Sequence, residues 1–140
     1  LARNTPRQPS VMRSSMCARP AMAPEETLRA FGERLASGDA DGAAALFSED
    51  ATYAEPPAYS FVGRAAIRGF VRDFAARHHD ASFTISRMLT RPDGQEAAAA
   101  WRFAYTRDAD GLHRVYEGMS FVTFRDGLIA AWRGYSALLT

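Results

Sequence analysis

Apolar residues in the first half of the chain recur every three or four positions, which is the period of an amphipathic helix. Leu28, Phe31 and Leu35 show this spacing between Pro24, which suits the first turn of a helix, and Gly38, which suits a stop. Two later segments repeat the pattern. Together they predict helices from Pro24 to a stop at Gly38, from Ala43 to Phe47, and from Gly63 to about His79.

Beyond residue 81 apolar and polar positions alternate instead, which is the pattern of strands with one buried face. Turn-forming residues interrupt the alternation at 92–94, 108–111 and 125–127. The pattern predicts four strands, over residues 82–91, 95–107, 112–124 and 128–138. Because short turns join consecutive strands, we expect an antiparallel meander, and the three helices before it indicate an α+β domain.

A short strand is also expected between the second and third helices, and it ends at an acidic residue. Thr52 and Tyr53 favour an extended backbone, and Pro56 disfavours a helical Glu55. The Pro56-Pro57 pair then stops the strand, because neither ring has an N–H to give to a sheet. In surroundings rich in tyrosine and alanine, desolvation would raise the pKa of the Glu55 carboxyl and make it a usable proton carrier. A solvated loop glutamate is the alternative interpretation.

The alternation gives the four long strands two different faces. One face combines large rings with small residues, at Trp101, Phe103, Tyr105, Tyr116, Gly118, Ser120, Val122, Trp132, Gly134 and Ser136. Small residues opposite rings leave either a cavity or gaps that helix side chains fill, and both interpretations remain open. The other face carries both charges and an aromatic, as an exposed or dimer-forming sheet would, at Arg102, Glu117, Arg133 and Tyr135.

Composition narrows the classes of function. With 140 residues, 47% hydrophobic and 24% charged, the chain suits one globular domain. All the acids follow residue 24, where 16 of them face 13 arginines, so no basic face for nucleic acid is expected. No stretch approaches the ~20 apolar residues of a membrane span, and we expect a cytoplasmic protein without a membrane partner. Cys17 alone cannot form an internal disulfide or a metal site.

The order of elements and several short motifs resemble the nuclear transport factor 2-like superfamily, and more narrowly its SnoaL-like and ketosteroid isomerase branch. The matching segments are Ser37-Gly38-Asp39, Phe47-Ser48-Glu49-Asp50-Ala51-Thr52, Glu55-Pro56, Gly63-Arg64-Ala65-Ala66-Ile67, Phe124-Arg125-Asp126-Gly127-Leu128-Ile129 and Trp132-Arg133-Gly134-Tyr135. The resemblance covers roughly residues 25–137. It implies a cone: a curved mixed sheet, made of the short strand and the four-strand meander, wrapped around three N-terminal helices. Residues 1–23 would be a disordered arm or upstream sequence, and residues 24–140 the domain.

The resemblance also assigns roles to single positions. Glu55 stands where ketosteroid isomerases keep an Asp general base, whereas Phe31 and Ser120 stand where that family keeps its Tyr and Asp oxyanion donors. Phe31 has no hydroxyl, and losing one such donor costs ~10²–10³ in rate. The Asp-Arg-Asp cluster of epoxide hydrolases is not matched, because Gly134 and Ala137 stand where related sequences carry acids.

We therefore expect a pocket that binds a small apolar or ring-containing molecule, without cofactor or metal. This binding pocket is the leading hypothesis, and if the protein is an enzyme, Glu55 would carry a proton in an isomerase or dehydratase-type step. A non-catalytic binding or dimerisation domain, and an epoxide hydrolase or polyketide cyclase-like enzyme, are the alternatives. The candidate catalytic residues are Glu55 and Ser120; the candidate substrate-binding residues are Phe31, Leu35, Tyr53, Phe70, Trp101, Phe103, Tyr105, Tyr116, Gly118 and Trp132. A homodimer through the outer sheet face is expected.

Overall fold

A computed structural model describes residues 22–140, so the predicted N-terminal arm lies almost entirely outside the described residues. The elements in chain order are α2 (Pro24–Ser37), α3 (Ala40–Ala44), β1 (Phe47–Glu55), β2 (Tyr59–Val62), α4 (Arg64–Arg77), β3 (His78–Thr90), β4 (Glu96–Arg107), β5 (His113–Arg125) and β6 (Leu128–Leu138). The six strands form one sheet in the order β2-β1-β6-β5-β4-β3. Strand β1 runs parallel to β6, and all other neighbours are antiparallel. The α+β class and the mixed sheet are confirmed.

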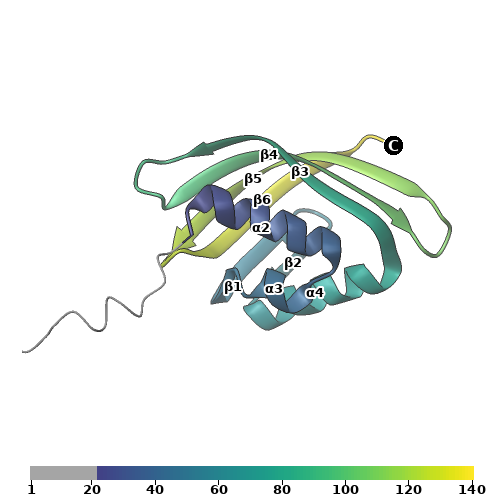
Figure 1. The fold of residues 1–140 in the computed structure, drawn as a ribbon, viewed down its shortest axis with the longest axis horizontal. Helices are drawn as coiled ribbons and strands as arrows, with labels where there is room; N and C mark the ends of the chain where they lie inside the picture. The colour runs from purple at the N-terminus through teal and green to yellow at the C-terminus, as the bar shows by residue number, and fades with distance from the viewer. Residues whose placement is uncertain (1–21) are drawn as a thin grey trace, which may run out of the picture.

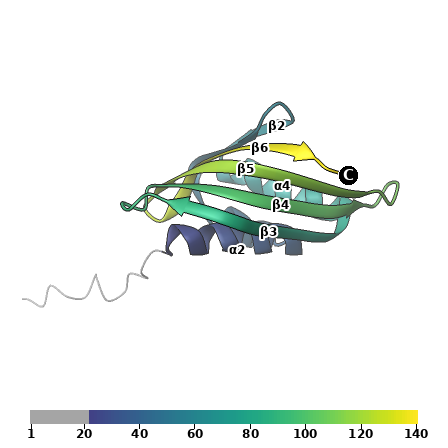
Figure 2. The same ribbon diagram turned by 90° about the horizontal axis from the view of Figure 1, so that it is seen from above.

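The sheet arches over the helices, which all lie on its inner side (Figure 1). Figure 2 shows the long strands β3 to β6 side by side in front of α2 and α4, with the outer face of the sheet turned to the viewer. The core between these layers contains the apolar stripes of both long helices and inward residues of the sheet. Its fully buried large side chains include Leu28, Phe31, Leu35, Phe47, Ile67, Val71, Val122, Ile129 and Trp132.

Strands β4 to β6 match the predicted meander closely, and β6 has the predicted bounds. Strand β3 begins at His78 rather than at residue 82, and α4 ends at Arg77 rather than at about His79. Both histidines pair with β4, and this pairing overrides the local helical pattern.

The region before α4 differs from the prediction in three further ways. Helix α3 spans Ala40–Ala44 rather than Ala43–Phe47, strand β1 is nine residues long rather than short, and Tyr59–Val62 forms the unpredicted edge strand β2. Phe47 accordingly belongs to a strand, because pairing with β6 overrides a local sequence of small and acidic residues that favours no strand by itself.

The two faces of the meander also follow the alternation. Trp101, Ser120 and Trp132 are buried on the inner side. Arg102 and Glu117 pair across neighbouring strands on the exposed side, where Arg102 Nη2 lies 2.8 Å from Glu117 Oε1. The inner face of the sheet therefore carries the side chains that can form a site inside the arch.

Candidate functional site

Glu55 is the last residue of β1 and is buried, with 8% of its surface exposed. It pairs with Tyr59 at the start of β2, so the chain turns back immediately after the carboxyl. The Tyr53 hydroxyl, two residues earlier on the same face, donates a 3.3 Å hydrogen bond to Glu55 Oε1. The structure thus places Glu55 inside the protein and not on a solvated loop.

Burial raises the pKa of Glu55, because the charged carboxylate loses hydration. The Tyr53 and Tyr59 hydroxyls and the nearby Trp132 indole N–H oppose this rise without cancelling it. Within residues 22–140 no arginine or histidine lies within ion-pair distance of the carboxyl. Burial likewise raises the pKa of both tyrosines, which keeps them protonated as donors.

A second group of polar atoms converges beside Gly134 of β6. A Cβ at Gly134 would lie 2.7 Å from Ser120 Oγ, 3.1 Å from Glu55 Oε1 and 3.2 Å from Trp132 Nε1. Ser120 Oγ accepts a 2.9 Å hydrogen bond from Trp101 Nε1, so its own O–H can be directed elsewhere. The buried Trp132 Nε1 has no hydrogen-bond partner among the described residues, although its N–H lowers the pKa of Glu55.

A cavity of about 380 Å³ lies in front of Glu55. This volume falls within the ~300–1,000 Å³ typical of small-molecule sites. Helix α4 contributes one wall, the β1–β2 turn closes one end, and β4, β5 and β6 form the opposite wall. The lining residues are Glu55, Pro56, Pro57, Ala58, Tyr59, Phe70, Phe74, His78, Trp101, Phe103, Tyr105, Tyr116 and Ser136.

The predicted site residues divide into two groups. Those that line the cavity are Glu55, Phe70, Trp101, Phe103, Tyr105 and Tyr116. Those that lie outside its lining are Phe31, Leu35, Tyr53, Gly118, Ser120 and Trp132. Phe31 and Leu35 belong to the closed core under α2, whereas Tyr53, Ser120 and Trp132 stand behind Glu55 and reach it or its neighbours.

The lining also contains residues that sequence reasoning did not select, chiefly Tyr59, Phe74 and His78. Phe74 and His78 follow Phe70 at intervals of four, so the helical period could have found them. His78 Nδ1 lies 2.8 Å from the Phe74 carbonyl oxygen, which only accepts, so Nδ1 carries the proton. This contact caps the last turn of α4, the role that its position at the helix end predicts.

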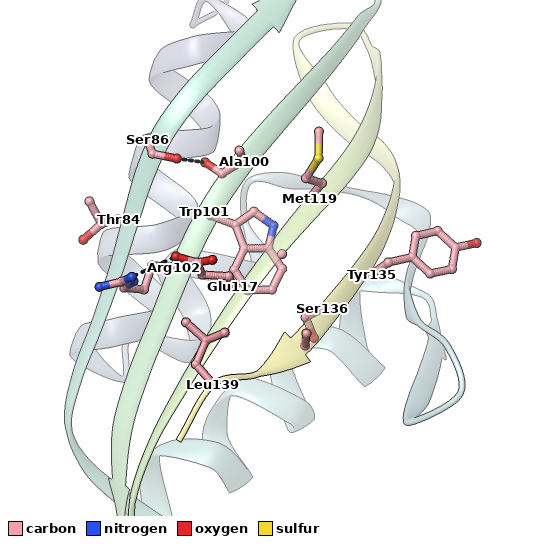
Figure 3. Close-up of a pocket in the computed structure, with 12 residues that line it drawn as sticks. Thr84, Ser86, Ala100, Trp101, Arg102, Glu117, Met119, Tyr135, Ser136 and Leu139 are labelled. Atoms are coloured by element: carbon pink, nitrogen blue, oxygen red, sulfur yellow. Dashed lines mark hydrogen bonds and ion pairs between the residues drawn. The ribbon is translucent and has the colours of Figure 1, made fainter.

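A larger but shallow hollow of about 930 Å³ lies on the outer side of the sheet. Figure 3 shows the Arg102–Glu117 pair across it, with Met119 and Tyr135 alongside. Its charged groups are paired and exposed, and none is desolvated. The inner cavity is the better candidate for chemistry, because its carboxyl is both buried and unpaired.

Comparisons with known proteins agree with the fold. The family model for the SnoaL-like domain matches residues 28–132. A candidate isomerase from Bacillus subtilis superposes with a TM-score of 0.74 at 26% identity, over 82% of this chain and 86% of that one.

Two further similar structures are named for other activities. An LEH-like epoxide hydrolase from M. tuberculosis gives a TM-score of 0.72 at 19% identity, over 82% of this chain and 83% of that one. A candidate scytalone dehydratase from Novosphingobium aromaticivorans gives a TM-score of 0.72 at 18% identity, over 82% of both chains. No curated protein matches the chain. At such identities the last two structures show a shared fold and leave the reaction undetermined.

Proposed function

The chain belongs to the SnoaL-like domain family, and on that basis we propose that it transfers protons on a small ring-containing molecule in the cavity before Glu55. The observation that supports this most is the buried carboxyl at the cavity wall, which has no cationic partner among the residues described. A carboxyl whose pKa is raised toward neutrality is a better general base than an ordinary surface glutamate. We propose an isomerase or dehydratase-type enzyme that works without a cofactor.

The simplest such step is an isomerisation. The Glu55 carboxylate takes a proton from a C–H next to a carbonyl, and the electrons of that bond move to the carbonyl oxygen as an enolate forms. The same carboxyl then returns the proton to another carbon of the conjugated system. The hydroxyls of Tyr59, Tyr105 and Tyr116 line the cavity and can donate to the developing oxygen anion. Burial raises the pKa of Tyr105 to about 12, so this hydroxyl is protonated at neutral pH.

A non-catalytic binding domain is the second candidate, and one observation favours it. The two positions that the family resemblance links to oxyanion donors contribute no donor to the cavity surface: Phe31 is a core ring, and Ser120 lies behind the lining. An epoxide hydrolase is less well supported. Arg133 bonds Tyr135 on the outer face, with Arg133 Nε 2.7 Å from the Tyr135 hydroxyl, and Gly134 supplies no second acid. For a polyketide cyclase-like step, Glu55 is the one acid in the lining.

Hydrogen–deuterium exchange tests the proposal. A panel of cyclic and bicyclic ketones is incubated with the protein in D₂O, and loss of α-proton signals is followed by NMR. We expect catalysed exchange for at least one ketone and a loss of ~10²-fold or more in Glu55→Gln, whose amide cannot accept a proton. Glu49→Gln, an exposed residue of the same strand, is the matched control and should behave as wild type. Ketones that bind without any Glu55-dependent exchange would support the binding domain instead.

We also propose that two copies pair through the outer sheet face. Exposed apolar side chains on β5 and β6 support this assembly. The cytoplasmic location expected from the sequence stays a prediction.

A further inference from the structure

Glu55 is the one acidic residue that lines the cavity in the described part of the chain. The lining contains no lysine or arginine, and its other polar groups are tyrosine hydroxyls, the Ser136 hydroxyl and His78. His78 Nδ1–H donates to the Phe74 carbonyl oxygen, so this N–H is not available to a ligand in the cavity. When ionised, the Glu55 carboxylate therefore has no arginine or lysine beside it among the described residues that line the cavity.

Aromatic side chains supply most of the remaining surface, and they come from opposite walls. Phe70 and Phe74 project from α4, and Phe103, Tyr105 and Tyr116 from the sheet. The rings form two contacting groups. In one the Phe74 and Tyr105 centroids lie 5.1 Å apart, and in the other those of Tyr59 and Phe70 also lie 5.1 Å apart. Ring faces carry negative electrostatic potential and attract cations, most strongly where water is excluded.

From these two features we propose that the ligand is an organic cation: a tertiary or quaternary ammonium group attached to an apolar or ring-containing body. The ammonium group would lie against Glu55 and the body between the rings. A methylated ammonium suits this site better than a primary ammonium, because it is weakly hydrated and does not have three N–H donors to satisfy in a lining that is mostly aromatic. This ligand class rests on the proposed function, in which the cavity in front of Glu55 is the ligand site.

A matched pair of ligands separates charge from shape. Benzyltrimethylammonium and neopentylbenzene have nearly the same size and outline, but only the first is charged. Binding of each to the full chain is measured by NMR titration at low salt and pH 7.5. We expect the cation to bind at least tenfold more tightly than its neutral counterpart. Glu55→Gln should remove this preference by weakening cation binding at least tenfold, while neutral binding stays within threefold of wild type.

Two further variants test the separate contributions of the carboxylate and of the rings. Glu49→Gln should keep the wild-type preference, because this exposed carboxyl lies outside the cavity lining. Phe74→Leu keeps an apolar side chain of comparable bulk but removes a ring, so it should weaken the cation more than the neutral compound. Circular dichroism establishes that each variant is folded.

Three outcomes would overturn the inference: a neutral compound that binds as tightly as the cation, a Glu55→Gln variant that keeps the preference, or no binding of the cation at millimolar concentration. None of these outcomes argues for or against the proposed proton transfer, which the ketone exchange experiment tests independently. Conversely, tight Glu55-dependent cation binding without exchange on any ketone would support an organic-cation ligand and refute the proposed proton transfer.

Discussion

Glu55 is held inside the protein by hydroxyl groups rather than by a cation, and this arrangement has an energetic consequence. A carboxyl whose pKa is raised by folding binds its proton more tightly in the folded than in the unfolded state. Its contribution to stability is therefore fully present below the unfolded pKa near 4.5 and is lost as the pH rises through the folded pKa. At neutral pH the ionised side chain opposes folding.

Replacing Glu55 by Gln should consequently stabilise the protein at pH 7 and have little effect at pH 4. Each unit of upward pKa shift corresponds to about 1.4 kcal/mol, and we expect the melting temperature to rise by about 2–6 °C at pH 7. Thermal melts of both proteins from pH 4 to 8 check this. The difference between the two should grow through the window above pH 4.5. A constant difference across that range, or none at pH 7, would contradict a desolvated carboxyl.

Gly134 is the residue that allows Ser120, Glu55 and Trp132 to meet. A Cβ there would sit within 3.2 Å of all three polar atoms, and 2.7 Å from Ser120 Oγ is too close for carbon. We expect Gly134→Ala to lose about 1–3 kcal/mol of unfolding free energy by urea denaturation, as overpacked sites do. Gly69→Ala is the control, since a Cβ at this position in α4 meets nothing within 4 Å. That change should add about 0.5–1 kcal/mol, because alanine is the better helix former. Equal effects at the two sites would mean that the Ser120, Glu55 and Trp132 side chains move away from an added Cβ at little energetic cost.

At the scale of the elements, the Arg64 side chain links the start of α4 to the start of β1. The Arg64 guanidinium donates from Nε and Nη2 to the Phe47 carbonyl oxygen, at 2.9 and 2.7 Å. The register of β1 against β6 shifts between Phe47 and Thr52, so the sheet is irregular here and the carbonyl benefits from a side-chain partner. Helix α4 carries one wall of the cavity, which makes this contact a support for the site.

Arg64→Met keeps the apolar stem and removes the donors, so the Phe47 carbonyl would be left buried without them. We expect a loss of about 1.5–3 kcal/mol in urea denaturation, the range for hydrogen bonds to charged groups. Arg72→Met is the matched control on the same helix, because Arg72 is mostly exposed and lies 3.8 Å from an exposed Asp41 carboxylate. Its effect should stay within about 0.5 kcal/mol. Similar losses in both variants would show that Arg64 contributes only its charge.

The elements that could be predicted are those that local chemistry determines. Glu55 at a strand end follows from Pro56, and the meander follows from alternation and turn residues. The boundary between α3 and β1 could not be found, because Phe47 joins a strand only through pairing with Ile129 of β6. The grouping of Ser120 with Trp132 depends likewise on the register of β5 against β6, which is shifted between Thr123 and Phe124. Such irregularities are tertiary properties that no local pattern contains.

At the scale of the whole molecule, no helix within residues 22–140 covers the outer face of the sheet (Figure 2). It exposes Met119, Phe121 and Tyr135, with 60%, 71% and 53% of their surfaces accessible. The Arg102–Glu117 pair lies beside Met119 and Tyr135 around the outer hollow (Figure 3). Neighbouring apolar residues with charges of both signs suit an isologous contact, in which the same surface serves both copies.

This surface should hold a homodimer together. We expect sedimentation at micromolar concentration to show a species of twice the 15.4 kDa chain mass. Phe121→Arg places a charge among the exposed apolar residues of this face, and desolvating that charge against a second copy should shift the protein to monomer. Ala76→Arg adds the same charge to an exposed position in the last turn of α4, where a cation is tolerated, and should leave the dimer intact. A wild-type protein that sediments only as monomer would refute the dimer. A Phe121→Arg variant that stays dimeric would move the interface to another face of the molecule.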